Sequence, residues 1–103
     1  MSARVQRLYE AGLALKDKDP SKSRTSRLFA AGRRRLAKKL GEEAMEVVIE
    51  AIKGDRQKVV GESADLLYHL VMIWVDLGIP PNEIWKEMDR RETERGIAEK
   101  MKP

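Results

Sequence analysis

The sequence contains no cysteine and only one histidine. Disulfides, thiolate catalysis and cysteine zinc sites are therefore excluded, as are histidine-rich metal sites. No apolar run approaches the roughly 18 residues that a membrane-spanning helix needs, and the first residues include no apolar signal region. We therefore expect a cytoplasmic protein that does not associate with membranes. A glycine-rich phosphate loop is also missing, which argues against a P-loop enzyme.

The composition fits a single domain over residues 1–103. With 42% hydrophobic and 37% charged residues, the chain is typical of a charge-rich helical protein. A chain this short has a modest core, to which a partner subunit would add. The net charge of +4 and the isoelectric point near 9.5 suit a phosphate-rich ligand, either small or polymeric.

Hydrophobic residues recur at helical spacing along most of the chain, and no segment alternates with the period of a β-strand. The pattern predicts five helices: Ala3–Lys16, Thr25–Ala31, Arg33–Lys53, a segment that follows Asp55 and ends at Leu77, and Asn82–Glu94. Short connections between long helices favour antiparallel neighbours. We therefore predict an all-α antiparallel bundle of four to five helices.

Several residues mark the expected helix ends. Gly54 is placed to cap the third helix at its C-terminus, Asp55 to cap the fourth at its N-terminus, and Gly78 to end the fourth. Three apolar residues of the last helix are predicted to face inward: Ile84, Trp85 and Met88. The tail from 96 to 103 shows no reliable periodicity.

Two acidic pairs lie in the third and fourth predicted helices. Glu43 and Glu46 form the first pair, and Glu62 and Asp65 form the second, each with a spacing of three residues. A short connection makes the two helices antiparallel neighbours, so both pairs are expected to face one cleft. Such a cluster repels itself and should raise at least one carboxylate pKa. Binding of Mg²⁺ or Mn²⁺, hard cations that prefer oxygen ligands, would relieve the repulsion.

The fourth helix strengthens this interpretation. The segment from Ala64 to Val75 is apolar nearly all the way round, which is typical of a buried helix. Its only strongly polar residues, Asp65 and His69, share one face with Glu62. A carboxylate in an apolar wall is costly unless it is compensated, and a shared divalent cation supplies that compensation.

Other interpretations stay open for these residues. An E-E-x-x-E string alone is most often a solvated helix face, and only its coupling to E-x-x-D favours a site. His69 is either a core histidine bonded to a carboxylate or a functional residue. Arg33–Arg35 is either a solvated first turn or a contact to phosphate or nucleic acid. Three aromatic residues are assigned to the core rather than to base stacking: Tyr68, Trp74 and Trp85.

The expected chemistry is attack by water rather than by a protein nucleophile. No serine, threonine or cysteine stands beside a recognisable base, so a covalent intermediate is not expected. Water activated by a metal ion is the better candidate for attack on a phosphoanhydride. Lys38 and Lys39, before the first acidic pair, and Arg56, after it, are candidates to neutralise phosphate oxygens.

Three segments carry a family resemblance: Lys39–Ala44 followed by Glu46, then Gly54-Asp55, and then Ala64–Leu70. Together they resemble, nearly residue for residue, the central signature of the phosphoribosyl-ATP pyrophosphatases. This family lies within the MazG-type superfamily of all-α nucleoside triphosphate pyrophosphohydrolases. Upstream residues are similar to the family's S-x-T-x-x-L-x-x-x-G segment: Ser23, Thr25, Leu28 and Gly32. The resemblance covers most of residues 5 to 92.

The resemblance implies a MazG-like bundle that hydrolyses phosphoribosyl-ATP to phosphoribosyl-AMP and pyrophosphate with Mg²⁺, the second step of histidine biosynthesis. The implied metal ligands are Glu43, Glu46, Glu62 and Asp65. Glu42 would support the metal or the water. The weaker candidates for phosphate contact are Lys38, Lys39 and the segment Ser23–Arg27, within which Ser23, Thr25 and Arg27 are the residues assigned to bind substrate. The resemblance also implies a homodimer or higher homo-oligomer with its sites near the subunit interface.

Three departures from the family pattern bear on the substrate rather than on the metal, and one of them is the unusually basic approach to the motif at Arg33–Arg35. Arg24 stands where the family often has tyrosine, and Ser63 stands where alanine is common. Two other functions are left open. One is a related pyrophosphatase that acts on ordinary or damaged nucleotides. The other, from a different class, is a basic helical module that binds nucleic acid, for which the isoelectric point and the arginine run are the motivation.

Overall fold

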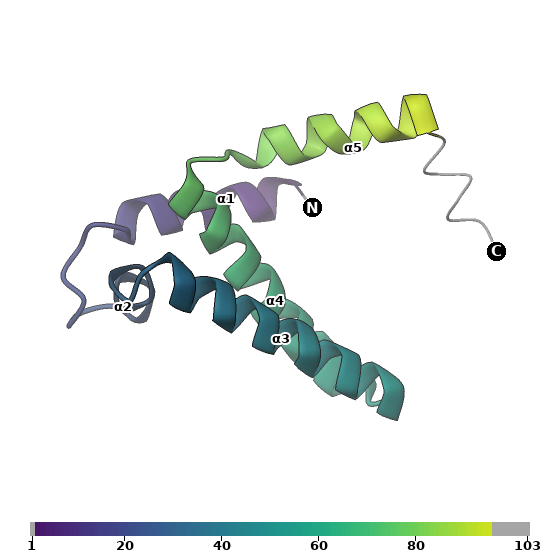
Figure 1. Ribbon diagram of the computed structural model, residues 1–103, viewed down its shortest axis with the longest axis horizontal. Helices are drawn as coiled ribbons and strands as arrows, with labels where there is room; N and C mark the ends of the chain where they lie inside the picture. The colour runs from purple at the N-terminus through teal and green to yellow at the C-terminus, as the bar shows by residue number, and fades with distance from the viewer. Residues whose placement is uncertain (1, 96–103) are drawn as a thin grey trace.

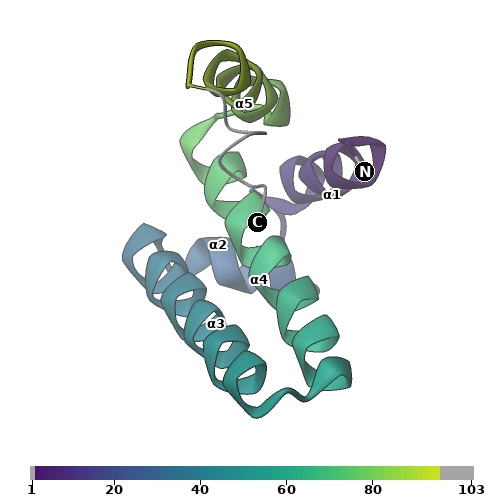
Figure 2. The same cartoon turned by 90° about the vertical axis from the view of Figure 1, so that its right-hand side faces the viewer.

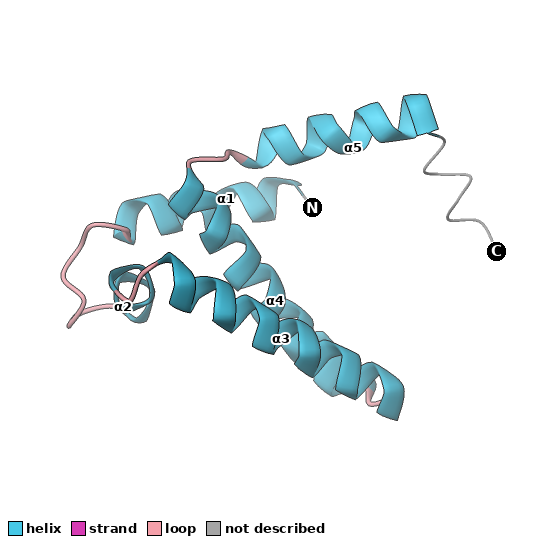
Figure 3. Cartoon of the chain, viewed as in Figure 1, coloured by secondary structure: helices cyan, strands magenta, loops and turns pink. Residues whose placement is uncertain are grey.

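The computed structural model describes residues 2–95, and every regular element in that range is an α-helix (Figures 1 and 3). The helices are α1 (Ser2–Leu15), α2 (Arg24–Ala30), α3 (Arg33–Lys53), α4 (Arg56–Leu77) and α5 (Pro81–Arg95). The predicted all-α class is confirmed, and each helix bound lies within a residue or two of its expected position. The tail from 96 to 103 lies outside the described residues. None of the helices in the described range combines the length and apolarity needed to cross a membrane.

The longest helices, α3 and α4, form an antiparallel hairpin (Figures 1 and 2). Gly54 ends α3 in the left-handed conformation, with φ of 73°, and its N–H bonds to the carbonyls of Glu50 and Ala51. The Asp55 carboxylate then accepts a hydrogen bond of 3.1 Å from the backbone N–H of Lys58. Both predicted caps are confirmed, and together they turn the chain through a very short connection.

The core lies at one end of this hairpin, where α1 crosses the C-terminal half of α4 (Figure 2). The buried apolar residues are Val5, Tyr9, Leu36, Val71, Met72, Trp74 and Val75. From α5, the Trp85 ring meets the Trp74 ring edge-on, with 6.2 Å between their centroids. The core is therefore built from α1, the start of α3, the end of α4 and one side of α5.

Two expectations about burial are wrong. The segment from Ala64 to Val75 was expected to be buried throughout, yet Ala64 and Asp65 are exposed and Leu67 is 48% exposed. Full burial begins only at His69, because the core covers only the C-terminal half of α4. Met88 is 51% exposed, whereas Ile84 and Trp85 pack against the core as predicted.

Hydrogen bonds from side chains fix α2 beside α1 and α4. The Ser23 hydroxyl caps α2 by accepting from the N–H of Ser26 at 3.2 Å. The buried Ser26 hydroxyl donates to the carbonyl of Leu15 at 2.7 Å, and the hydroxyls of Thr25 and Tyr68 are hydrogen-bonded to each other. These bonds hold the start of α2 against α4, and this placement proves important for the site.

Gly12 allows the close approach of α1 to α4. A Cβ atom at this position would lie 2.8 Å from Met72 Sδ and 3.0 Å from Val75 Cγ2, both in the buried core. We expect Gly12→Ala to lower the free energy of unfolding by about 1–3 kcal/mol, because the core has no room for the methyl group. Urea denaturation followed by circular dichroism measures this change.

Gly61→Ala is the matched control for this prediction. Gly61 is also inside a helix, but a Cβ there meets no atom within 4 Å. Replacing it should raise the free energy of unfolding by about 0.5–1 kcal/mol through helix propensity alone. Equal stabilisation by the two substitutions would show that the contact between α1 and α4 does not require glycine.

Candidate active site

Three carboxylates meet midway along the hairpin: Glu43 from α3, and Glu62 and Asp65 from α4. One oxygen from each lies within 4.8 Å of the others, and we call this group the acidic triad. Glu43 and Glu62 are half-buried, whereas Asp65 is exposed. The antiparallel pairing of α3 and α4 brings Glu43, from the first predicted pair, together with both members of the second, Glu62 and Asp65. Because Asp65 is exposed, the expectation that an apolar wall encloses it is wrong.

Two further predicted residues flank the acidic triad on α3. Glu46 is exposed and does not join the triad's close group of oxygens, but its charge acts on Glu62. Glu42 is exposed one residue before Glu43, and its carboxylate is not part of the close group either. The structure thus brings three of the five predicted acids into one cluster and leaves two at its edge.

The acids of the cluster act on the protonation of Glu62. Partial burial raises the pKa of the Glu62 carboxyl above its ordinary 4.5, and the charge of Glu46 raises it further. A hydrogen bond and charge from Glu43, and the charge of Asp65, act in the same direction. Both kinds of cause disfavour the charged form of this carboxyl, because burial withdraws it from water and the neighbouring carboxylates repel it.

His69 is buried next to the acidic triad, with its ring fixed by two contacts. Its Nδ1–H donates a 2.8 Å hydrogen bond to the backbone carbonyl of Asp65, rather than to a carboxylate. Its ring also meets the Tyr68 ring edge-on, with 5.1 Å between centroids. In the neutral form the Nε2 atom is therefore the acceptor of this imidazole.

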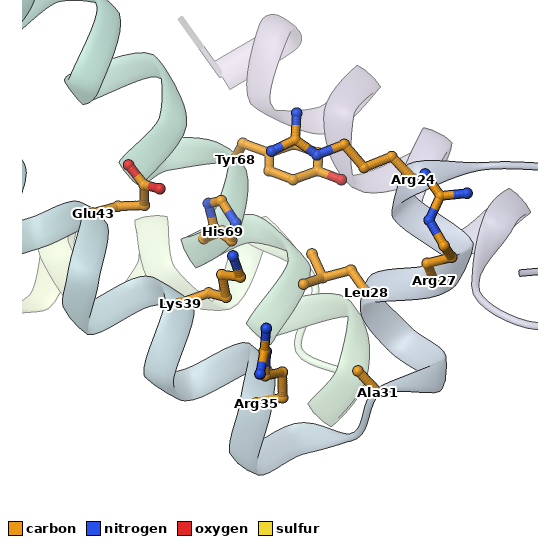
Figure 4. A pocket seen from close by; sticks show the side chains of 9 residues that line it. All are labelled: Arg24, Arg27, Leu28, Ala31, Arg35, Lys39, Glu43, Tyr68 and His69. Carbon is orange, nitrogen blue, oxygen red and sulfur yellow. The ribbon is translucent and has the colours of Figure 1, made fainter.

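A pocket of about 270 Å³ lies beside the triad, lined by residues from α2, α3 and α4 (Figure 4). Four cationic side chains line it: Arg24 and Arg27 from α2, and Arg35 and Lys39 from α3. We call it the basic pocket. Glu43 and His69 also line it, so it adjoins the acidic triad directly. Figure 4 shows Arg24 reaching toward Tyr68, and Lys39 pointing toward His69.

The residues predicted to contact phosphate occupy different places. Two of them line the basic pocket: Lys39 and Arg27. Lys38 is exposed and does not line it, and Arg56 lines a separate hollow at the tip of the hairpin. The hydroxyls of Ser23 and Thr25 are engaged in the hydrogen bonds that position α2.

Sequence reasoning named Arg24 and Arg35 only within longer segments, and it missed Glu50. Arg35 belongs to the arginine run for which a phosphate contact was one of two interpretations, and its recurrence with Lys39 and Glu43 every four residues places all three on one helix face. Arg24 belongs to the segment Ser23–Arg27, and the tertiary placement of α2 brings it to the pocket. Glu50 continues the stripe of acids on α3, and it is only 9% exposed. Its Oε1 atom finds no hydrogen-bond partner within the described chain.

Comparison with known proteins assigns a family to this arrangement. The profile of the phosphoribosyl-ATP pyrophosphohydrolase family matches residues 5–92, which span all but the edges of the described chain. The chain belongs to this family. The resemblance seen in the motifs is thereby confirmed, and the acidic triad and the basic pocket both lie inside the matched range.

Relatives of this phosphoribosyl-ATP pyrophosphohydrolase family member align over nearly its full length. It is 55% identical to phosphoribosyl-ATP pyrophosphatase 2 of Bradyrhizobium diazoefficiens, over 98% of this chain and 75% of the relative. It is 51% identical to the phosphoribosyl-ATP pyrophosphatase of Gluconobacter oxydans, over 93% and 72% of the two chains. It is 48% identical to the phosphoribosyl-ATP pyrophosphatase of Azospirillum brasilense, over 96% of this chain and 89% of the relative.

The donor atoms of the acidic triad fit a hard divalent cation. All three are carboxylate oxygens, the type that Mg²⁺ and Mn²⁺ prefer, and they stand close enough to share one ion. Burial is the larger cause of the raised pKa of Glu62, and the smaller part that comes from neighbouring carboxylates is a repulsion that such an ion would relieve. The expected Mg²⁺ or Mn²⁺ stays a prediction, for which the acidic triad supplies oxygen ligands of the right type.

The raised pKa of Glu62 predicts how the metal-free protein responds to pH. The folded state holds the Glu62 proton more tightly than the unfolded state, so this residue makes stability fall as pH rises upward from about 4.5. Glu62→Gln removes the titration. Thermal unfolding in EDTA across pH 4 to 7 should show wild type losing stability relative to Glu62→Gln as pH rises, and added Mg²⁺ should restore wild type only.

Other perturbed acids do not obscure this difference. Ion pairs with Arg90 and Arg91 lower the pKa of Glu87 to about 2. Its stabilising effect is therefore already complete above 4.5, and it is lost only as pH falls toward 2. Parallel curves for wild type and Glu62→Gln would contradict the electrostatic description of the acidic triad.

Proposed function

We propose that this chain hydrolyses phosphoribosyl-ATP to phosphoribosyl-AMP and pyrophosphate at the acidic triad, with Mg²⁺ or Mn²⁺ as its cofactor. Its family makes it a hydrolase of histidine biosynthesis, as the names of its relatives indicate. The observation that carries the site assignment is the convergence of Glu43, Glu62 and Asp65 beside a pocket lined by four cations. A cation site next to an anion site is the arrangement that a metal-bound polyphosphate requires.

The acidic triad is assigned to hold the cation. Glu46, whose charge already acts on Glu62, is assigned as a fourth carboxylate around it. When bound, the ion supplies positive charge at the phosphate oxygens and lowers the pKa of coordinated water. Glu42, exposed at the edge of the triad, is assigned to orient the attacking water and accept its proton. Attack at the α-phosphorus breaks its bond to the bridging oxygen and releases pyrophosphate.

A protein nucleophile is not part of this proposal. The Ser26 hydroxyl is buried and donates to a backbone carbonyl, and the Thr25 hydroxyl is bonded to Tyr68. Neither hydroxyl is therefore available to attack a phosphorus atom. Lys39, one helical turn before Glu43, is placed to donate from its Nζ to phosphate oxygens as negative charge develops there.

The arginine run that motivated the nucleic-acid alternative does not form one surface. Arg33 makes a 2.6 Å ion pair with Asp76, while Arg35 lines the basic pocket. A small phosphorylated nucleotide is therefore the better match for these charges. We place the reaction in the cytoplasm, because the substrate is made from ATP and ATP is abundant there.

Substrate choice is the direct test of the proposal. Purified protein with Mg²⁺ should release pyrophosphate from phosphoribosyl-ATP much faster than from a panel of nucleoside triphosphates. Asp65→Asn should lose at least about 100-fold in kcat, as expected for loss of a ligand to the catalytic metal. In EDTA the Asp65→Asn variant should be at least as stable as wild type, because one repulsive charge is gone.

Two results of this test would contradict the proposal. Pyrophosphate released only from the panel would make the chain a pyrophosphatase of ordinary nucleotides. Marked unfolding of the Asp65→Asn variant in EDTA would show that Asp65 belongs to a structural ion pair rather than to a metal site.

We further propose that the chain works as a homodimer. Four apolar residues of α3 follow helical spacing on the side away from α4, and we call them the apolar stripe: Met45, Val48, Ile49 and Ile52. All are exposed, Ile52 to 83%, and Val60 on α4 is 70% exposed. The radius of gyration of 15.5 Å exceeds the ~13 Å expected for a compact domain of this length. An uncovered apolar surface of this kind marks an interface, and a symmetric dimer is its commonest form.

Sedimentation velocity tests the dimer. Wild type should sediment as a dimer, whose mass is twice the 11.8 kDa of one chain. Ile52→Lys places a charge in the apolar stripe and should shift the protein to monomer at micromolar concentration. Gln6→Lys, at an exposed position of α1 outside the stripe, is the control and should remain dimeric. A monomeric wild type would contradict the proposal.

A further inference from the structure

The basic pocket holds more positive charge than the protein itself compensates. Arg24, Arg27, Arg35 and Lys39 surround one cavity, and within residues 2–95 none of them forms an ion pair. Gathering four like charges raises the free energy of the chain unless an anion offsets them. Three of the four are arginines, whose planar donor fork matches the oxygens of a phosphate. The chemistry of this cavity is therefore that of a phosphate site.

The cations extend well beyond the acidic triad. Arg35, Lys39 and Glu43 follow one another at intervals of four residues on one face of α3. At 1.5 Å rise per residue, Arg35 lies about 12 Å from Glu43 along the helix axis, with Lys39 midway. Lys39 is placed to serve the phosphates at the triad. Arg35 stands at the far end, and a pyrophosphate leaving group, two phosphorus atoms joined by one oxygen, is too short to need it.

The proposed substrate offers a phosphate at such a distance. Phosphoribosyl-ATP carries a triphosphate on one ribose and a single phosphate ester on another. ATP carries only the triphosphate. If the triphosphate lies at the acidic triad, the ester phosphate must lie some way from it. The cavity of about 270 Å³ is small for a whole nucleotide but is suited to a sugar phosphate.

The rest of the lining is consistent with a sugar phosphate. Leu28 and Tyr68 give the pocket an apolar wall against which a sugar ring can pack. Arg24 lines both this pocket and a neighbouring one that contains Asp65, so it stands between the two phosphate positions. The hydrogen bond between Thr25 and Tyr68 ties the start of α2 to α4, which holds the base of Arg24 in place.

We propose that the basic pocket binds the ribose 5-phosphate part of the substrate, and that Arg24 and Arg35 select the phosphoribosylated nucleotide over ATP. This inference rests on the proposed function, because it takes the acidic triad as the point of cleavage. It adds a second binding point, and it explains what the cations distant from the triad do. Loss of one such charge-assisted contact should weaken binding by about tenfold or more.

The first experiment measures binding without catalysis. Titration calorimetry in EDTA uses ribose 5-phosphate and inorganic pyrophosphate as separate probes of wild type, Arg24→Gln, Arg35→Gln and Arg34→Gln. Arg34 is exposed in the same run but does not line the pocket, so Arg34→Gln is the matched control. Ribose 5-phosphate should bind wild type and the control equally, and about tenfold more weakly to the two pocket variants.

The second experiment measures turnover of phosphoribosyl-ATP with Mg²⁺. Arg24→Gln and Arg35→Gln should raise KM by about tenfold or more, with a much smaller effect on kcat. Arg35→Lys, which keeps the charge but not the fork, should restore part of the loss. All four exposed substitutions are checked for native circular dichroism first. If Arg24 and Arg35 had a merely structural role, their substitution would lower kcat as well as change KM. Arg35→Lys would then not restore the loss.

The outcomes separate this inference from the proposed function. If the pocket variants weaken pyrophosphate binding instead of ribose 5-phosphate binding, the pocket holds the leaving group and the inference is overturned. Equal ribose 5-phosphate binding by all variants also overturns it. If wild type fails to hydrolyse phosphoribosyl-ATP while the calorimetry gives the expected pattern, the proposed function fails and the sugar phosphate site stands.

Discussion

The pairing of α3 with α4 is the constraint on which the site depends. Glu43 is separated in sequence from Glu62 and Asp65, and only the antiparallel hairpin sets their oxygens within 4.8 Å. The turn at Gly54 fixes the register, because a shift of one residue rotates a helix face by about 100° and would separate the acids. At the opposite end, the ion pair of Arg33 with Asp76 links α3 to α4 again. Since Arg33 is largely exposed, this pair orients the helices more than it stabilises them.

The same hairpin contains several features that are unfavourable in an isolated chain. One edge of α3 gathers acids that repel one another, and Glu50 is buried there with an oxygen that has no hydrogen-bond partner among the described residues. The side away from α4 carries the apolar stripe, which no part of the chain within residues 2–95 covers. The local core reaches only the far end of the hairpin, so the middle of it has little hydrophobic support of its own. A cation on one edge and a second subunit on the other would each remove one of these costs. Such local conflicts concentrate where a protein carries function.

The features predicted correctly from sequence were those set by local chemistry. Gly54 and Asp55 cap helices through bonds to residues within four positions, and helix bounds follow from such bonds and from apolar spacing. Burial was predicted less well, because it depends on which elements cover a surface. The predicted burial of Asp65 and Met88 is wrong, because the apolar pattern of α4 and α5 does not reveal how far the core extends. The basic pocket was missed as a unit, because the bonds that dock α2 are tertiary: Ser26 to Leu15, and Thr25 to Tyr68.

The separation of charge at the site identifies the kind of ligand that completes it. Lys39 and Glu43 are spaced to form an ion pair along α3, yet none is made between the basic pocket and the acidic triad within the described chain. Had the opposite charges neutralised each other, neither a cation nor a phosphate would find an unpaired partner. Keeping them apart leaves one region whose charge suits a divalent cation and another whose charge suits phosphate. A substrate that carries both a metal-bound polyphosphate and a second phosphate group would satisfy both regions at once, whereas a simple anion or a simple cation would leave half of the site uncompensated.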